Sequence, residues 1–315
     1  MAKTKKDSGG EKMMTFEDFK KTVKENILAY LPDDCKEVKI ESIQKNNGFS
    51  YDGLIVKPGQ NGVSPILNLE QFYHTYKDGV NFEDVLLAMA EDFKKYSKDG
   101  NKMEKQFNEA KYFEKAKNRI MPELINVSEN KQLLKSIPHQ MIADLAVIYV
   151  VLIEGVDGYI ATTKISNALM KMYGLTVDEL HRLAVENMEK HCEIEFIGLG
   201  QKILGEMNVA EKSEETEPVN VLSVLNDIGG SAAAVLSEKV MERVIDKVGE
   251  NFYILPASVH EVLIVSADLN SANELQNLQD IVKSVNAETL DPKERLSDAV
   301  YIYDREKKEI RIAEF

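Results

Sequence analysis

The chain has 315 residues, of which 43% are hydrophobic and 29% are charged. This length and composition predict a folded protein with a sizeable core, in one large domain or two small ones, and they exclude disorder as the default. Lys and Arg number 39 against 53 Asp and Glu, which gives a formal charge of −14. Most of the surface would therefore repel phosphate, and we expect no nucleic-acid partner.

The sequence predicts no membrane partner and no secretion. The longest strongly apolar run, Leu145–Ile153, is about half of the roughly 18 residues that a membrane-spanning helix needs. The lysines near the N-terminus are not followed by the apolar stretch of a secretory signal. Cys35 and Cys192 are too few for a disulfide framework, so we expect two free thiols and a cytoplasmic location.

The first part of the chain predicts a flexible tail, a helix and a hairpin. Residues 1–14 are expected to form the tail. Thr15, with Asp18 three residues later, is typical of a helix N-cap, and Pro32 ends the helical pattern. Two runs of strand-forming residues then flank Asn46-Asn47-Gly48, which is a hairpin signal, and a third run at residues 65–69 is expected to join the same sheet.

The middle of the chain alternates helical and strand patterns. From Glu70 to about Arg119 the pattern is helical, with Asn81 as a candidate N-cap. A strand is predicted at Leu124–Val127. Because Leu145–Ile153 is apolar on both faces, it predicts a central strand that is covered on both sides. Thr176 and Glu179 then form a second capping box at the start of a helix.

The predicted fold class is α+β: a mixed sheet core covered by helices, with a C-terminal α/β subdomain that ends in a β-hairpin. Residues 15–210 are expected to form the main domain. Residues 211–218 are acidic, poor in apolar residues and closed by proline, which predicts a linker. Residues 219–315 form the predicted subdomain, packed on the main domain, and its final hairpin pairs Ala299–Tyr303 with Glu309–Ala313.

Short sequences that resemble metal sites do not complete their motifs. His260-Glu261 matches the first half of the zinc-protease motif H-E-x-x-H, but Ile264 stands where the second histidine belongs. A denser group of metal-ligating side chains has no second, spaced pair of ligands; it consists of His191, Cys192, Glu193 and Glu195. We therefore expect no metal and no cofactor.

Two glycine-containing segments also fall short of catalytic or phosphate-binding motifs. Gly198, Gly200 and Gly205 lack the spacing of a dinucleotide fingerprint and the final G-K-[ST] of a P-loop, so they predict a helix start. Ser231 follows two glycines, but Ala233 replaces the second glycine of the nucleophile elbow G-x-S-x-G, and a helix N-cap is the better interpretation. No catalytic residue is predicted.

Several segments together resemble an uncharacterised family, a domain of unknown function widespread in anaerobic gut bacteria and often encoded near mobile elements. The segments that carry the resemblance are Gly48–Leu54, Ser64–Leu69, Asp144–Ile153, Leu175–Asn187, Phe252–Val262 and Leu296–Arg305. Since the family has no established activity, the resemblance implies no catalytic residues.

Two functional hypotheses follow from these observations. The first is a non-catalytic binding or accessory protein that acts through contacts with a protein partner, with the link to mobile elements that the resemblance implies. The alternative is a hydrolase-like enzyme whose site is carboxylate-based, because only five histidines are available for acid–base chemistry.

The turn between two apolar runs near residue 258 is the predicted binding surface. Pro256 fixes its own φ, Ser258 can bond the nearby backbone, and His260 and Glu261 follow at the expected end of a strand. A rigid loop that presents polar side chains is typical of binding sites. The alternative is a tight strand connection in which Glu261 or the backbone satisfies His260.

Overall fold

The structure is a computed structural model that describes residues 13–58, 65–97, 100–154, 160–206, 217–225, 231–266 and 272–314. The chain divides into two compact units. The first comprises residues 1–44 and 50–104, and the second comprises residues 45–49 and 105–315. Each unit is described below by itself.

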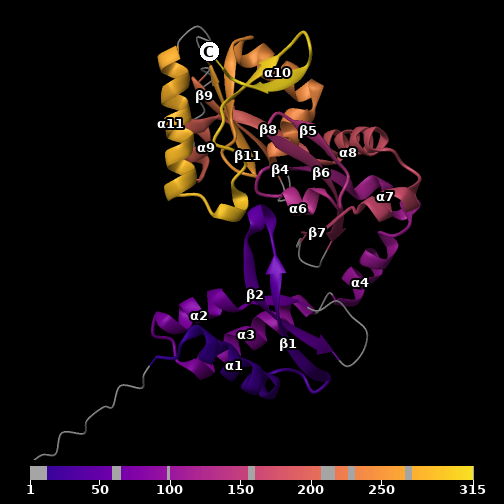
Figure 1. The fold of residues 1–315 in the computed structure, drawn as a ribbon, viewed down its shortest axis with the longest axis vertical. Coiled ribbons are helices and arrows are strands. Elements are labelled where there is room, and N and C mark those ends of the chain that lie inside the picture. The colour runs from indigo at the N-terminus through magenta and orange to yellow at the C-terminus, as the bar shows by residue number, and fades with distance from the viewer. Residues whose placement is uncertain are drawn as a thin grey trace, which may run out of the picture. The chain divides into compact units, whose positions relative to one another are not determined.

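The first unit is a three-stranded antiparallel sheet packed against helices (Figure 1). Its elements are α1 (Phe16–Asn26), the 3-10 helix η1 (Ile27–Tyr30), β1 (Cys35–Gln44), β2 (Ser50–Pro58), β3 (Ile66–Asn68), α2 (Leu69–Lys77), α3 (Phe82–Ser97) and the first half of α4 (Gly100–Glu109). The predicted hairpin and the third strand beside it are confirmed.

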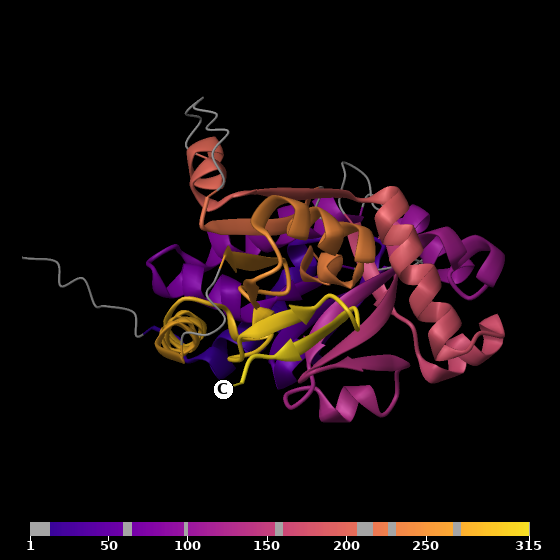
Figure 2. The same cartoon turned by 90° about the horizontal axis from the view of Figure 1, so that it is seen from above.

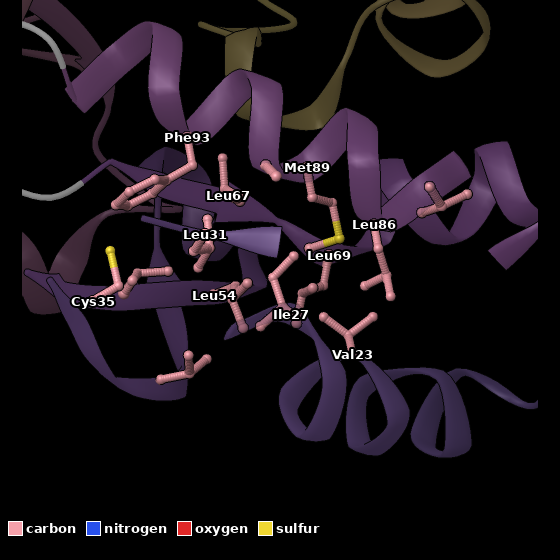
Figure 3. Packing of buried hydrophobic residues seen from close by; sticks show 14 of the residues in the cluster. Val23, Ile27, Leu31, Cys35, Leu54, Leu67, Leu69, Leu86, Met89 and Phe93 are labelled. Atoms are coloured by element: carbon pink, nitrogen blue, oxygen red, sulfur yellow. The ribbon is translucent and has the colours of Figure 1, made fainter. Parts of the chain in front are cut away.

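The core of the first unit lies between α1, α3 and the sheet. Val23 of α1, Leu54 of β2 and Met89 of α3 are completely buried and pack in one cluster (Figure 3). The predicted caps hold the two helices in place. Asp18 N donates to Thr15 Oγ1 at 3.2 Å, and Asp84 N donates to Asn81 Oδ1 at 3.1 Å. Local sequence therefore defines where these helices begin.

The second unit holds two sheets and the remaining helices. Its helices are α5 (Phe113–Ala116), η3 (Lys117–Arg119), α6 (Lys131–Leu134), α7 (Asn167–Tyr173), α8 (Val177–His191), α9 (Leu199–Glu206), η4 (Ser231–Leu236), α10 (Glu238–Val248), α11 (Ala272–Glu288) and η5 (Pro292–Glu294), together with the short turn η2 (Asn46–Gly48). Its strands are β4 (Ile120–Asn126), β5 (His139–Ile142), β6 (Leu145–Glu154), β7 (Ile160–Lys164), β8 (Glu193–Gly198), β9 (Val219–Leu225), β10 (Phe252–Leu255), β11 (Glu261–Ser266), β12 (Tyr301–Asp304) and β13 (Glu309–Ile312).

Strand β6 is the centre of the first of these sheets. It pairs along one edge with β4 and along the other with both β5 and β7. Every residue of Leu145–Ile153 is buried, which confirms the prediction of a central strand covered on both faces. Helix α8 packs on β4 and β6 through buried side chains such as Leu180 and Ala184, and α6 contributes Leu134 to a second cluster that includes Ile148.

The other sheet has six strands in the order β13-β12-β10-β11-β9-β8. Helix α11 covers one face, where Leu275 and Val282 pack with Tyr253 and Val300 (Figure 1). The α+β class and the C-terminal hairpin are confirmed. The mixed sheet is not, because all pairings between described strands are antiparallel. Most strands pair with the strand that precedes them in the chain. A chain that turns back directly makes two such neighbours antiparallel.

The expected boundary at residues 211–218 does not coincide with the division into compact units. Strand β8 precedes that segment and β9 follows it, yet the two strands pair along six residue positions from Glu193↔Leu225 to Gly198↔Asn220. Residues 211–216 lie outside the described part of the chain, as do residues 1–12 of the expected tail. Among the described residues, no helix is both long and apolar enough to cross a membrane.

Candidate functional site

The turn that was predicted as a binding surface connects β10 to β11 and is closed by its own hydrogen bonds. His260 N donates to Ser258 Oγ at 3.0 Å, and Ser258 N donates to Glu261 O at 3.1 Å. Val259 N also donates to Glu294 O at 2.9 Å, which fixes the turn to η5. Ser258 is buried, so its hydroxyl serves the turn itself.

The four predicted residues of this turn lie in different environments. Pro256 and Ser258 are buried, whereas the side chain of His260 is 61% exposed and its Nε2 lies 3.9 Å from Glu294 Oε1. Glu261 forms an ion pair with Lys202 of α9. Of the four, only His260 offers an open side chain to a partner.

The glycines at the start of α9 surround a carboxylate from the same chain. Gly200 N donates to Glu217 Oε2 at 2.7 Å, and Gln201 N donates to Glu217 Oε1 at 3.2 Å. Glu217 thus occupies the position that an anion takes at a helix N-terminus. The predicted helix start is confirmed, and the glycines leave room for the Glu217 side chain.

Gly198→Ala is expected to lower the free energy of unfolding by about 1 kcal/mol, the usual value of a helix N-cap. A Cβ at this position would overlap with the Glu217 carboxylate and displace it from the helix end. Urea denaturation measures the loss. In a Glu217→Ala background the same substitution should cost little, and an equal loss in both backgrounds would contradict the explanation.

The remaining motif residues do not gather into a reactive site in the described part of the chain. Cys35 and Cys192 are free, and burial raises the pKa of both thiols, which disfavours the nucleophilic thiolate. His191 ends α8 and Glu193 begins β8. No three His, Cys, Asp or Glu side chains in the described ranges are placed to hold one metal ion. The glycines before Ser231 lie outside the described residues.

A pocket of about 430 Å³ lies elsewhere in the second unit, between the β5–β6 turn, η4, α10 and the β12–β13 hairpin. Figure 2 shows the yellow hairpin beside the magenta strands of the other sheet. The lining residues are Met141, Ile142, Ala143, His181, Val235, Leu236, Glu238, Met241, Tyr303, Lys308, Glu309 and Ile310. The volume is within the range of roughly 300–1,000 Å³ typical of ligand sites.

The polar groups of this pocket are mostly paired within the chain. His181 Nδ1 and the Tyr149 hydroxyl lie 3.1 Å apart. Burial lowers the pKa of His181 and raises the pKa of Tyr149, so both groups favour their uncharged forms. At the rim, Lys308 Nζ lies 2.5 Å from Glu238 Oε2. The lining therefore includes seven apolar residues, but its accessible surface is more polar than apolar, with a neutral imidazole and one ion pair.

One wall of the pocket is the open edge of the six-stranded sheet. Within the described ranges, β13 pairs only with β12. Ala313 N donates to Val300 O at 2.8 Å, which makes these two residues a hydrogen-bonded pair of the antiparallel ladder. Because such pairs alternate, the peptide groups of Ile310 and Ile312 point away from β12. Ile310 thus presents both its side chain and its backbone to the pocket region.

No local sequence signal marks this pocket. Its lining comes from five separate segments, and most of the residues are apolar or belong to turns. Two turn residues in the lining, Ala143 and Lys308, have φ values of 52° and 55° although neither is glycine. That conformation is uncommon for these residue types, but a sequence without coordinates does not reveal it.

A family model described as "Family of unknown function (DUF5688)" matches residues 16–305. The match confirms the predicted resemblance to an uncharacterised domain family. Gut bacteria and nearby mobile elements, which the resemblance also implied, stay predictions. Searches of curated proteins and of solved structures found no match.

Proposed function

We propose that the chain, which belongs to the family of unknown function DUF5688, is a non-catalytic binding protein that acts through contact with a protein partner. The partner contributes an extended segment that runs along β13 and places one apolar side chain in the pocket. An accessory role near mobile genetic elements is part of the same proposal and rests on the family resemblance alone.

One observation supports this proposal: the pocket lies beside β13, whose outer edge has no strand partner among the described residues. An added strand would hydrogen-bond to the outward N–H and C=O groups of Ile310 and Ile312. Since side chains alternate along a strand, every second residue of the segment would point toward the pocket face. Main-chain bonds would supply affinity, and the pocket would supply selectivity for an apolar side chain.

The rim also matches a peptide better than a charged metabolite. Glu238 and Lys308 neutralise each other, and His181 favours its uncharged form. The carboxylate of Glu309 therefore leaves the lining with a negative charge, which disfavours an anionic metabolite. The exposed Met141 adds a flexible apolar contact, which suits partners of varied shape. The hydrolase alternative would instead require a bound small substrate at a carboxylate.

Met141→Arg is expected to reduce capture of the partner by at least about tenfold, because a cation would replace an apolar contact at the pocket wall. Met141 is 54% exposed, so the fold should tolerate the change. The matched control is Met172→Arg, since Met172 is 71% exposed on α7 and does not line the pocket. Affinity capture from the native host, with quantitative mass spectrometry, measures both variants and the unchanged protein.

The outcomes separate the competing hypotheses. A partner protein that is lost with Met141→Arg and kept with Met172→Arg supports the proposal. Equal recovery by both variants would contradict the pocket as the docking site, and retention of a small molecule in place of a protein would favour the hydrolase. His260→Ala is a further variant in the same experiment. It tests the β10–β11 turn, because it removes the exposed side chain of His260.

A further inference from the structure

Strand β1 leaves one edge of the three-stranded sheet of the first unit open. It spans 10 residues and pairs with β2 along one edge, and no described strand pairs with its other edge. The pairing is regular from Glu37 to Gln44, because its register shift lies before that stretch. A long, regular strand edge is a template for a further strand.

Two hydrogen bonds show which residues of β1 direct their peptide groups to the open edge. Lys45 N donates to Phe49 O at 2.7 Å, so this pair closes the hairpin as a hydrogen-bonded pair. Asp52, which pairs with Ser42, donates its N–H to Glu70 Oε1 at 2.9 Å instead of to β1. Since hydrogen-bonded and non-hydrogen-bonded pairs alternate, every second residue of β1 points its N–H and C=O away from β2. These residues are Val38, Ile40, Ser42 and Gln44.

The side chains at this edge combine an apolar group with charges of both signs. Ile40 is partly buried and packs against the core cluster of the first unit. Lys39 and Glu41 project from the other face of the strand. Glu41 is exposed, and the side chain of Lys39 is 43% exposed, with its Nζ 3.2 Å from Glu37 Oε1. Ser42 is also exposed, so the edge is accessible to another chain.

The charges of β1 favour one way of pairing this strand with its own copy. The two antiparallel registers that pair most of the regular stretch place the two-fold axis at Ile40 or at Glu41. With the axis at Glu41, two identical carboxylates lie directly opposite each other, which is destabilising. Glu37 would face Lys45 in that register, but Lys45 lies beyond the end of β1.

The register with the axis at Ile40 is self-complementary. Each Lys39 lies opposite Glu41 of the second copy, and symmetry produces this pair of opposite charges twice. The two Ile40 side chains meet at the centre, on the face that carries the core of each sheet. Lys39 can keep its contact with Glu37, because all three charged side chains lie on the same face.

We propose that β1 pairs with β1 of a second copy of this chain, with the two-fold axis at Ile40, so that two three-stranded sheets join into one continuous sheet. The outward N–H and C=O groups of Ile40 and Ser42 provide main-chain hydrogen bonds. The pairs of Lys39 with Glu41 select the register. This surface is formed by the first unit alone and goes beyond the contact proposed for β13.

Sedimentation velocity of the purified full chain, over a range of protein concentrations, measures the association. We expect a concentration-dependent dimer with twice the chain mass of 35.5 kDa. Lys39→Glu and Glu41→Lys should each weaken dimerisation about tenfold, because each places like charges opposite each other on both sides of the axis. The double exchange, Lys39→Glu with Glu41→Lys, restores opposite charges and should recover most of the dimerisation.

Lys171→Glu is the matched control, because it makes the same change of charge at an exposed position on α7 in the second unit. It should dimerise like the unchanged chain. Thermal melting of every variant confirms that the fold is retained. A monomer at every concentration, single exchanges that dimerise like Lys171→Glu, or a double exchange that dimerises no better than the single ones would overturn the proposal.

Ser42→Pro tests the main-chain contact without a change of charge. The N–H of Ser42 points away from β2, so proline leaves the pairing of β1 with β2 intact and removes a donor only from the open edge. The variant should melt cooperatively and dimerise at least about tenfold more weakly, because the added strand loses hydrogen bonds at two symmetric positions. A folded Ser42→Pro variant that dimerises like the unchanged chain would contradict strand pairing at this edge.

Discussion

Deletion of residues 298–315 is expected to abolish cooperative folding of the second unit. The deletion removes β12 and β13, and β12 is an internal strand that pairs with β10 through Tyr253↔Ile302 and Ile254↔Tyr301. It also removes Val300, which is completely buried under α11. Tyr253 and the inner face of α11 would then be exposed to water, and β10 would become an unpaired edge.

The expected loss is on the order of 5 kcal/mol or more, because each large apolar side chain that loses its burial costs about 1.5–3 kcal/mol. That is comparable with the total stability of a domain, about 5–15 kcal/mol. The truncated chain should show aggregation in gel filtration, loss of near-UV circular dichroism and binding of a hydrophobic dye. A sharp thermal transition in the truncated chain would instead show that the hairpin is an appendage.

Val300→Asp provides an independent test of the same point without shortening the chain. It places an unpaired carboxylate in the cluster beneath α11, which is strongly destabilising. Lys307→Ala, in the exposed turn of the same hairpin, is the control and should melt like the unchanged protein. Similar melting of both variants would contradict a buried role for this hairpin.

Local signals account for the elements that the sequence predicts well. The capping box at Thr176 and Glu179 is present, with Glu179 N donating to Thr176 Oγ1 at 3.3 Å and Thr176 N donating to Glu179 Oε2 at 2.8 Å. Gly174, the C-cap of α7, has a φ of 71°, which glycine adopts easily. Each of these signals depends on residues within one helical turn of each other, so a single sequence contains all the information.

Strand β4 begins earlier than the sequence predicts, and it includes a proline near its start. The sequence predicts this strand from Leu124, after Pro122, but β4 already begins at Ile120. Pro122 pairs with Tyr149 inside the strand. Proline is tolerated there because β4 is the edge strand of its sheet, where a missing N–H need not break the ladder. Whether a strand is central or at an edge is a property of the whole fold.

The features that the sequence did not predict depend on contacts between segments that are far apart in the chain. The pairing of β8 with β9 joins residues on either side of the expected linker, and nothing in Glu193–Gly198 specifies that partner. The pocket depends on the same kind of information, because its lining comes from segments that are far apart in sequence, such as those of Met141, Met241 and Ile310. Spacing along the chain cannot reveal such sites.

Asp144→Ala is expected to lower the free energy of unfolding by about 2–4 kcal/mol, because its carboxylate accepts two hydrogen bonds from buried residues. Ser297 Oγ donates to Asp144 Oδ2 at 2.6 Å, and the Tyr301 hydroxyl donates to Asp144 Oδ1 at 2.7 Å. Tyr301 is only 2% exposed, and burial raises its pKa, so the hydroxyl stays protonated and needs an acceptor. Urea denaturation should show a lower midpoint with an unchanged slope.

A double-mutant cycle with Tyr301→Phe tests this explanation. The phenylalanine removes the donor, so Asp144→Ala should cost clearly less in that background, with a coupling of about 1 kcal/mol or more. Strictly additive losses would contradict the hydrogen bond as the cause. Asp144 also follows Met141 and Ala143, which line the pocket, so this bond fixes the pocket wall to the C-terminal hairpin. Asp144→Asn keeps an acceptor at this position, and we therefore expect it to retain partner capture better than Asp144→Ala.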